Sequence, residues 1–145
     1  MESQNYKNHV RYYVPHHFVF YPVLMVMIGF SISYALKRTD ESLIWIFFAF
    51  SFFMMGWLSF MLRQHYALNN QNRIVRLEMR FRYYVLTNER LEKLEDRLSF
   101  GQISALRFAS DEELPALVTR AIVENLSPDA IKKAVNQWNP DHMRV

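Results

Sequence analysis

The sequence predicts an all-α protein, in which a two-helix transmembrane hairpin is followed by a long juxtamembrane helix and a small cytoplasmic helical domain. Three observations lead to this fold class. Two long apolar runs lie in the first half of the chain, the region after them repeats apolar residues at helical spacing, and no stretch alternates as a strand would. The 145 residues include no cysteine, which excludes a disulfide framework, a thiolate nucleophile and a zinc ribbon.

Residues 1–17 form an aromatic and histidine-rich segment ahead of the first apolar run. Tyr, His and Phe rings are typical of the headgroup layer of a membrane, because one end of the ring is apolar and the other is wet. We therefore expect an interfacial segment here, directly before a transmembrane hairpin over residues 18–62.

The hairpin consists of two uncharged runs, residues 18–36 and 43–62. At about 1.5 Å per residue, each run covers roughly 30 Å, the thickness of a hydrocarbon core. Helices buried in a soluble bundle are one alternative, but such helices would show a polar stripe. A cleaved signal peptide is the alternative for the first run, yet this run is longer than the usual apolar core of a signal, and a second run follows at once. We expect both runs to be retained as spans.

Only residues 37–42 separate the spans, so the hairpin must be tight and antiparallel, with both termini on one side. Lys7 and Arg11 precede the first span and five arginines follow the second, whereas the loop holds Lys37 and Arg38. The excess of positive charge beside the termini predicts that both are cytoplasmic. The five arginines are also expected to contact anionic lipid headgroups, unless they only set the orientation. They are Arg63, Arg73, Arg76, Arg80 and Arg82.

Small residues in both spans indicate where the helix backbones approach each other. Gly29 and Ser33 lie four residues apart in the first span. Ala49, Gly56 and Ser59 lie along the second span. We expect these residues to form the helix–helix contact of the hairpin.

Residues 63–98 are expected to form the juxtamembrane helix, with a bend at Leu68–Asn72, where three asparagines compete for backbone hydrogen bonds. Apolar side chains recur along this helix at alternating intervals of three and four, with Asn88 as a polar member. This short heptad pattern predicts self-association of the helix. The predicted contact residues are Ile74, Leu77, Phe81, Tyr84 and Leu91.

Residues 99–145 are predicted to fold as a small domain of short amphipathic helices. Ser110 and Glu113 have the spacing of a capping box, which predicts a helix that continues to Leu126. Ser127 followed by Pro128 predicts the start of the last helix, and Asn139 with Pro140 predicts its end.

Few residues have the pattern of a catalytic or cofactor site. His16, His17 and His65 would lie near the same membrane surface and are candidate ligands of a haem or a metal, but interfacial packing already explains them. We therefore expect no cofactor. The acidic clusters have the spacing of solvated helix faces, so we expect no enzyme, and the acidic balance after residue 82 argues against nucleic-acid binding.

Three stretches of the sequence are similar to those of a known protein family: "NYKNHVRYYVPHHFVFYP", "RQHYALNNQNRIVRLEMRFRYY" and "LSFGQISALRFASDEEL". With the two spans, they resemble an uncharacterised family of small bacterial two-span membrane proteins of unknown function. The resemblance covers nearly the whole chain and implies the bacterial inner membrane. It implies no activity and no functional residue.

Three functions are compatible with these predictions. The first is a non-enzymatic inner-membrane scaffold or accessory subunit, whose cytoplasmic helical domain self-associates or binds another membrane protein. The second is a homo-oligomeric pore or channel, although the absence of ionisable residues inside the spans argues against an ion-coupled carrier. The third is a membrane subunit with a haem or metal bound by histidine.

Overall fold

A computed structural model describes residues 4–10 and 12–141, most of which are helical and none of which forms a β-strand. The chain divides into two compact units. One unit is Tyr12–Asn69, and the other joins Met1–Arg11 with Asn70–Val145. The predicted all-α fold class is confirmed.

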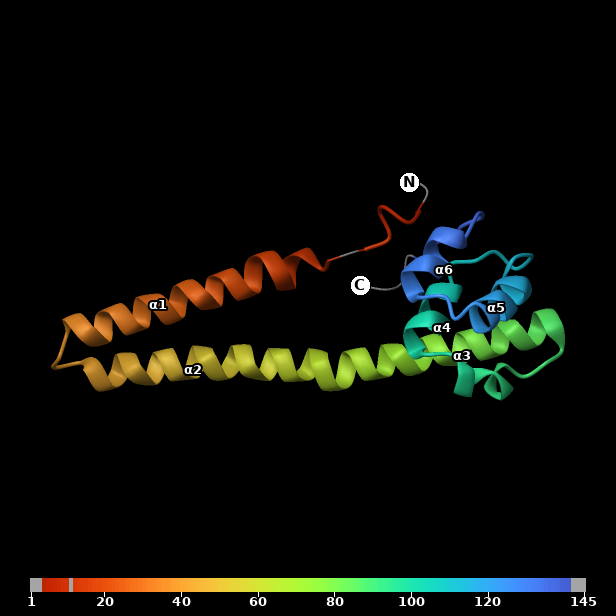
Figure 1. The fold of residues 1–145 in the computed structure, drawn as a ribbon. Helices are drawn as coiled ribbons and strands as arrows, with labels where there is room; N and C mark the ends of the chain where they lie inside the picture. Colours follow the sequence, from red (N-terminus) through yellow and green to blue (C-terminus); the bar gives the residue numbers. More distant parts are fainter. Residues whose placement is uncertain (1–3, 11, 142–145) are drawn as a thin grey trace. The chain divides into compact units, whose positions relative to one another are not determined.

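The first unit is an antiparallel helical hairpin (Figure 1). A π-helical stretch, η1 (Pro15–Phe20), leads into α1 (Tyr21–Lys37), and α2 (Ser42–Met61) returns after a short loop. Pro22 lies shortly after this π-helical stretch, so the continuous helix from Pro15 to Lys37 includes a residue without a backbone N–H about two turns from its start. Both helices are long and apolar enough to cross a membrane, and most of their large apolar side chains are exposed. They are therefore unlike the buried core helices of a soluble bundle.

The hairpin packs through only some of the predicted small residues. A Cβ atom placed on Gly56 would lie 3.4 Å from Leu24 Cδ1, so α1 approaches α2 closely at this glycine. Ala49, Ser59 and Ser33 are half-buried. A Cβ atom on Gly29 would meet no atom within 4 Å, so this glycine faces away from the helix contact.

Residues 68–72, where a bend was predicted, are helical and belong to α3 (Leu68–Thr87). The irregular stretch comes one turn earlier, as the π-helical η2 (Leu62–Ala67). The Asn69 amide donates a 2.6 Å hydrogen bond to the carbonyl oxygen of His65. The asparagine side chain therefore bonds back along the helix and does not interrupt it.

The helix that was predicted over residues 63–98 ends earlier, because α3 ends at Thr87. Asn88 has a φ of 56°, in the left-handed region that asparagine tolerates better than most residues. The Thr87 hydroxyl accepts a 3.1 Å hydrogen bond from the N–H of Glu89, which supports this sharp turn. Two 3₁₀ turns follow, η3 (Leu91–Lys93) and η4 (Glu95–Arg97).

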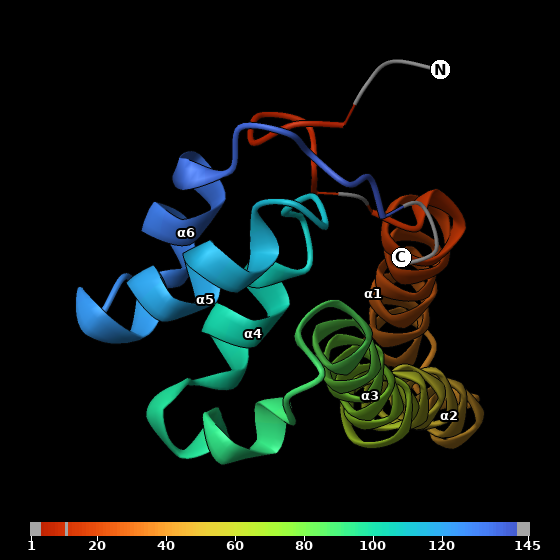
Figure 2. The same ribbon diagram turned by 90° about the vertical axis from the view of Figure 1, so that its right-hand side faces the viewer.

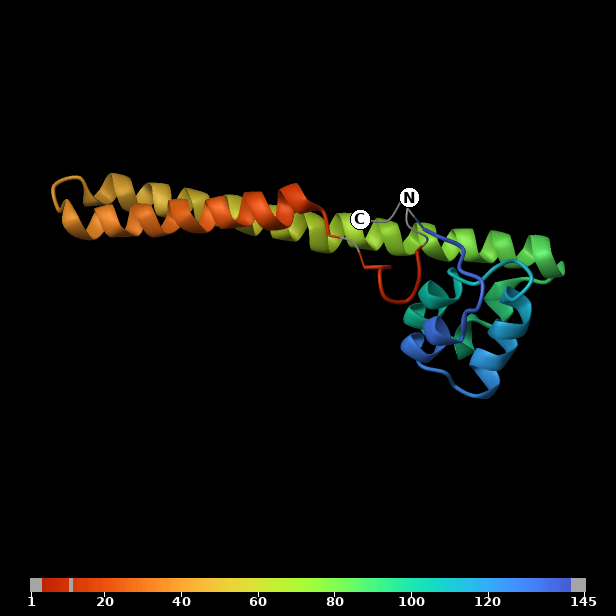
Figure 3. The ribbon, with the colours of Figure 1, turned by 90° about the horizontal axis from the view of Figure 1, so that it is seen from above.

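Three short helices complete the second unit: α4 (Phe100–Leu106), α5 (Leu114–Val123) and α6 (Pro128–Ala134). Ser99 and Gln102 form a complete capping box before α4, and Ser127 accepts the N–H of Ala130 at the start of α6. In Figure 2, which looks along α3, all three helices lie on one side of it, and Figure 3 shows the same arrangement from above.

The predicted capping box of Ser110 and Glu113 is only half formed. Ser110 Oγ accepts the N–H of Glu113 at 3.4 Å, and α5 begins at the next residue. The Glu113 carboxylate instead accepts the backbone N–H groups of Asn136 at 3.0 Å and Gln137 at 2.6 Å. These two bonds hold the chain after α6, which ends at Ala134 and not at the predicted Asn139.

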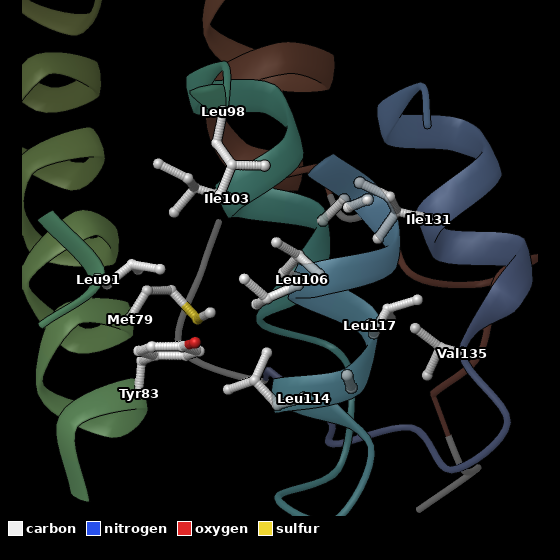
Figure 4. Packing of buried hydrophobic residues seen from close by; sticks show 14 residues of the cluster. Met79, Tyr83, Leu91, Leu98, Ile103, Leu106, Leu114, Leu117, Ile131 and Val135 are labelled. Carbon is white, nitrogen blue, oxygen red and sulfur yellow. The ribbon is translucent and has the colours of Figure 1, made fainter. Parts of the chain in front are cut away.

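The core of the second unit joins α3 to the three short helices. Met79 and Tyr83 of α3 point toward Leu91, Leu106 and Leu114 (Figure 4). Each of these five side chains is at most 5% exposed. The buried face of α3 thus anchors the whole domain to this helix.

Candidate functional site

The side of α3 opposite the core carries apolar side chains that the described residues do not cover. Leu77 is 66% exposed and Phe81 is 69% exposed, while Ile74 and Tyr84 are at least half exposed. We call Ile74, Leu77, Phe81 and Tyr84 the α3 apolar face. Single exposed apolar residues are ordinary, but four at successive helical turns form a continuous surface suited to a partner.

The structure places four of the five predicted self-association residues on this face and moves the fifth elsewhere. Leu91 is 0% exposed and belongs to the core. The helix has ended before Leu91, and the left-handed Asn88 turns the chain back toward the domain. The heptad spacing alone did not predict this turn, because asparagine is also common inside paired helices.

A bidentate ion pair connects α3 to the 3₁₀ turns beside it. Arg80 Nε donates to Glu95 Oε1 at 2.7 Å, and Arg80 Nη2 donates to Glu95 Oε2 at 2.5 Å. Arg76 adds a longer contact of 3.7 Å to the same carboxylate. The hydrogen bonds from Arg80 hold the pKa of the Glu95 carboxyl below its ordinary value.

A second arginine connects α3 to the loop between α4 and α5. Arg82 Nε donates to Asp111 Oδ1 at 2.6 Å. Its two terminal nitrogens donate to the carbonyl oxygens of Arg107 at 3.0 Å and Ala109 at 2.6 Å. The Arg82 side chain is only 19% exposed, so it works as a structural tie.

The five arginines predicted to contact lipid headgroups thus divide into two groups. Arg76, Arg80 and Arg82 have carboxylate or carbonyl partners within their own domain. The side chains of Arg63 and Arg73 make no hydrogen bond or ion pair with the described part of the chain. A headgroup contact therefore remains a prediction, most directly for these two.

The predicted histidine candidates lie at two separate irregular stretches. His16 and His17 are in η1 with their ring centres 5.3 Å apart, and His65 is in η2. His16 Nε2 lies 3.0 Å from Ser59 Oγ, and its ring stacks on Phe20 at 5.8 Å. Over residues 4–10 and 12–141, no three His, Cys, Asp or Glu residues gather as metal ligands would. The contacts of His16 are those of a packing residue between the two helices.

The start of the chain has an additional role that the sequence pattern did not predict. The Tyr6 hydroxyl donates a 2.6 Å hydrogen bond to Asp129 of α6. The ring of His9 lies 5.7 Å from that of Phe108 and 5.9 Å from that of Trp138. Hydrogen bonds from Lys133 and from Tyr6 lower the pKa of Asp129. The first described residues therefore pack on the helical domain, although they were predicted to be interfacial.

An open groove of about 530 Å³ lies between this N-terminal segment and α6. Its basic lining comes from Lys7, Lys132 and Lys133. Lys133 is paired with Asp129 at 2.7 Å, and Lys132 Nζ lies 3.0 Å from His9 Nε2. These contacts engage two of the three lysines within the domain, so the α3 apolar face is the stronger candidate site.

Comparison with known proteins adds one finding to this geometry. The whole chain, residues 1–145, matches the model of a family described as a family of unknown function (DUF6526). No curated protein and no solved structure matches the chain.

Proposed function

Because the chain belongs to the DUF6526 family, whose function is unknown, its role must be inferred from its own surfaces. We propose that it is a non-enzymatic scaffold or accessory subunit of the bacterial inner membrane. In this proposal the hairpin is the membrane anchor, and the helical domain is a cytoplasmic interaction module.

The observation that carries this proposal is the division of α3 into two faces. Met79 and Tyr83 hold the domain together, while Leu77 and Phe81 on the opposite side are left exposed by the part of the chain that the structure describes. Leaving such apolar surface in water costs free energy that a protein partner would recover. The domain is thus complete without this face, as expected of a surface kept for binding.

The anchor is supported by the composition of the hairpin. Its two helices carry exposed Phe, Met, Val and Ile side chains, which lipid tails would cover favourably. The residues from 18 to 36 and from 43 to 62 include no Asp, Glu, Lys, Arg or His. An ion-coupled carrier would need ionisable groups in these spans, so the anchoring role fits better than transport.

Labelling of single cysteines tests the anchor and its orientation, since the natural chain has no cysteine. We expect Thr39→Cys to react with a membrane-impermeant maleimide in intact cells. We expect Ser110→Cys to react only after the cells are opened. Labelling at Ser110 but not at Thr39 in intact cells would reverse the topology, and recovery of the chain in the soluble fraction would refute the anchor.

Crosslinking from native membranes tests the scaffold role. A photoreactive amino acid at Phe81 is expected to capture a protein, because this side chain is 69% exposed at the centre of the α3 apolar face. The matched control is the same group at Val123, which is 75% exposed on α5 but lies outside that face. Equal capture at both positions, or capture at neither, would contradict a specific interaction module.

A further inference from the structure

The α3 apolar face has the spacing of one strand of a coiled coil. Ile74, Leu77, Phe81 and Tyr84 follow intervals of three, four and three residues, which places them at positions a, d, a and d of a heptad. The buried residues Val75, Met79 and Tyr83 then fall at positions b, f and c, on the opposite side. The helix therefore uses one face for its own domain and presents a complete a/d face outward.

The flanks of this face carry charges that match a second copy of the same helix. Arg73 precedes Ile74 and occupies position g, and Glu78 follows Leu77 and occupies position e. Position g of one helix meets position e of the next heptad on its partner, five residues further along, in a parallel coiled coil. Arg73 and Glu78 are five residues apart, so each helix carries both halves of a reciprocal pair.

Both flanking residues are available for such a pair. Neither the Arg73 nor the Glu78 side chain makes a hydrogen bond or an ion pair with the residues that the structure describes. The next position g is Arg80, whose guanidinium is already bound to Glu95 within its own domain. The charged side chains that remain available beside the α3 apolar face are thus Arg73 and Glu78. They lie opposite each other when two helices pair in parallel and in register.

We propose that two copies of the chain pair through α3 in parallel and in register, with Arg73 of each copy bound to Glu78 of the other. The pairing is two-fold symmetric, so one surface serves both copies. An antiparallel pair would place position g beside g and e beside e, which brings like charges together. The parallel direction rests on the proposed function, because two copies anchored in one membrane with the same topology have parallel helices.

The short length of the face fits this arrangement. Four apolar layers make a weak coiled coil in free solution, where most isolated short helices are marginal. Anchoring both chains in one membrane raises the effective concentration of each helix for the other. The proposed contact is therefore strong in the membrane and weak for chains that are dispersed in excess detergent.

Disulfide formation at Ile74 tests the direction and the register. In a parallel pair, Ile74→Cys of one copy faces the same cysteine of the other, and oxidation in membranes should give a covalent dimer. In an antiparallel pair Ile74 would face Tyr84, and the two cysteines would be roughly 15 Å apart along the axis. Val123→Cys, which is exposed on α5, is the control and should stay monomeric. A dimer with the control but not with Ile74→Cys would overturn the proposal.

Charge exchange tests the reciprocal pair. Arg73→Glu alone and Glu78→Arg alone should each lower the yield of Ile74→Cys dimer, by roughly fivefold for two lost surface pairs. The two variants expressed together should restore the yield, because the mixed dimer has opposite charges at both contacts. The loss should fade in high salt, which screens exposed charges. Unchanged yields, or no recovery in the mixture, would refute the pairing.

These outcomes separate the pairing from the anchor on which it rests. Every variant is recovered from the membrane fraction, and its topology is checked through labelling of Thr39→Cys. Correct insertion without an Ile74 crosslink would refute the pairing alone. Failure of insertion would instead refute the proposed function.

Discussion

Single polar residues decide how α3 is joined to its domain. Glu95 receives two hydrogen bonds from Arg80 and a longer contact from Arg76, although it lies in a separate 3₁₀ turn. Its side chain is 11% exposed, so these bonds are little screened by water. One carboxylate therefore fixes the position of the turns that follow the helix.

Glu95→Gln should remove the ion pair with Arg80 and make the stability of the domain less dependent on acidic pH. Because Arg80 lowers the pKa of Glu95, the pair stabilises the fold above the ordinary pKa of a glutamate and loses this effect as the pH falls through the lowered value. The substitution should cost about 1–3 kcal/mol near pH 7. Between pH 7 and pH 3, the midpoint temperature of thermal unfolding should therefore fall less steeply for the variant than for the natural chain.

Glu124→Gln is the matched control for this prediction, because Glu124 forms an exposed pair with Arg120 in which both side chains are about half exposed. Such surface pairs contribute little to stability. The control should follow the natural chain at every pH. Equal losses from both substitutions would show that Glu95 has no special role.

The elements of the fold differ in how far the sequence could predict them. The two long apolar helices and the helix start at Ser127 and Pro128 follow from local composition, which is why they were predictable. The end of α3 was not, because Asn88 fits both a polar seam position and a left-handed turn. Only the burial of Leu91 in the core decides between these two conformations.

The residues of the candidate site could be predicted only in part. A heptad spacing identifies the residues of a helix face but not which of two faces the domain itself buries. The buried Val75, Met79 and Tyr83 have a helical spacing of their own. The contacts of Tyr6 and His9 with the domain were missed, because they join residues more than a hundred positions apart.

Gly56→Leu should weaken the packing of α1 on α2. A Cβ atom at Gly56 would already touch Leu24 Cδ1 at 3.4 Å, so the further carbons of leucine must displace that side chain. Overpacking of this kind costs about 1–3 kcal/mol. Gly29→Leu is the matched control, because a Cβ atom there meets nothing within 4 Å. The midpoint temperature of thermal unfolding in detergent should be lowered by the first substitution only. Equal effects of both substitutions would mean that the helices do not make their close contact at Gly56.

The molecule as a whole combines an apolar hairpin with a domain that is folded around one face of a helix. Among the residues that the structure describes, the hydrophobic core of the second unit is built from Met79 and residues that follow it in the sequence. Removing side chains from the outer face of α3 should therefore leave both units folded. A substitution in the inner face should instead unfold the domain without touching the hairpin.

Leu77→Ala together with Phe81→Ala tests this separation in the full-length chain. Both side chains are exposed, so the fold should be little affected, while a dimer that buries them should dissociate in mild detergent. Light scattering at a low ratio of detergent to protein, where the natural chain is expected to stay paired, should show the protein mass falling to that of one chain, with the variant still recovered from membranes. Met79→Ala is the contrasting variant, because Met79 is 2% exposed in the core and its truncation costs about 2–5 kcal/mol. It should make residues 99–141 sensitive to protease. An unchanged mass for the double variant, combined with faster proteolysis of the same region, would mean that the outer face belongs to the monomer's own fold.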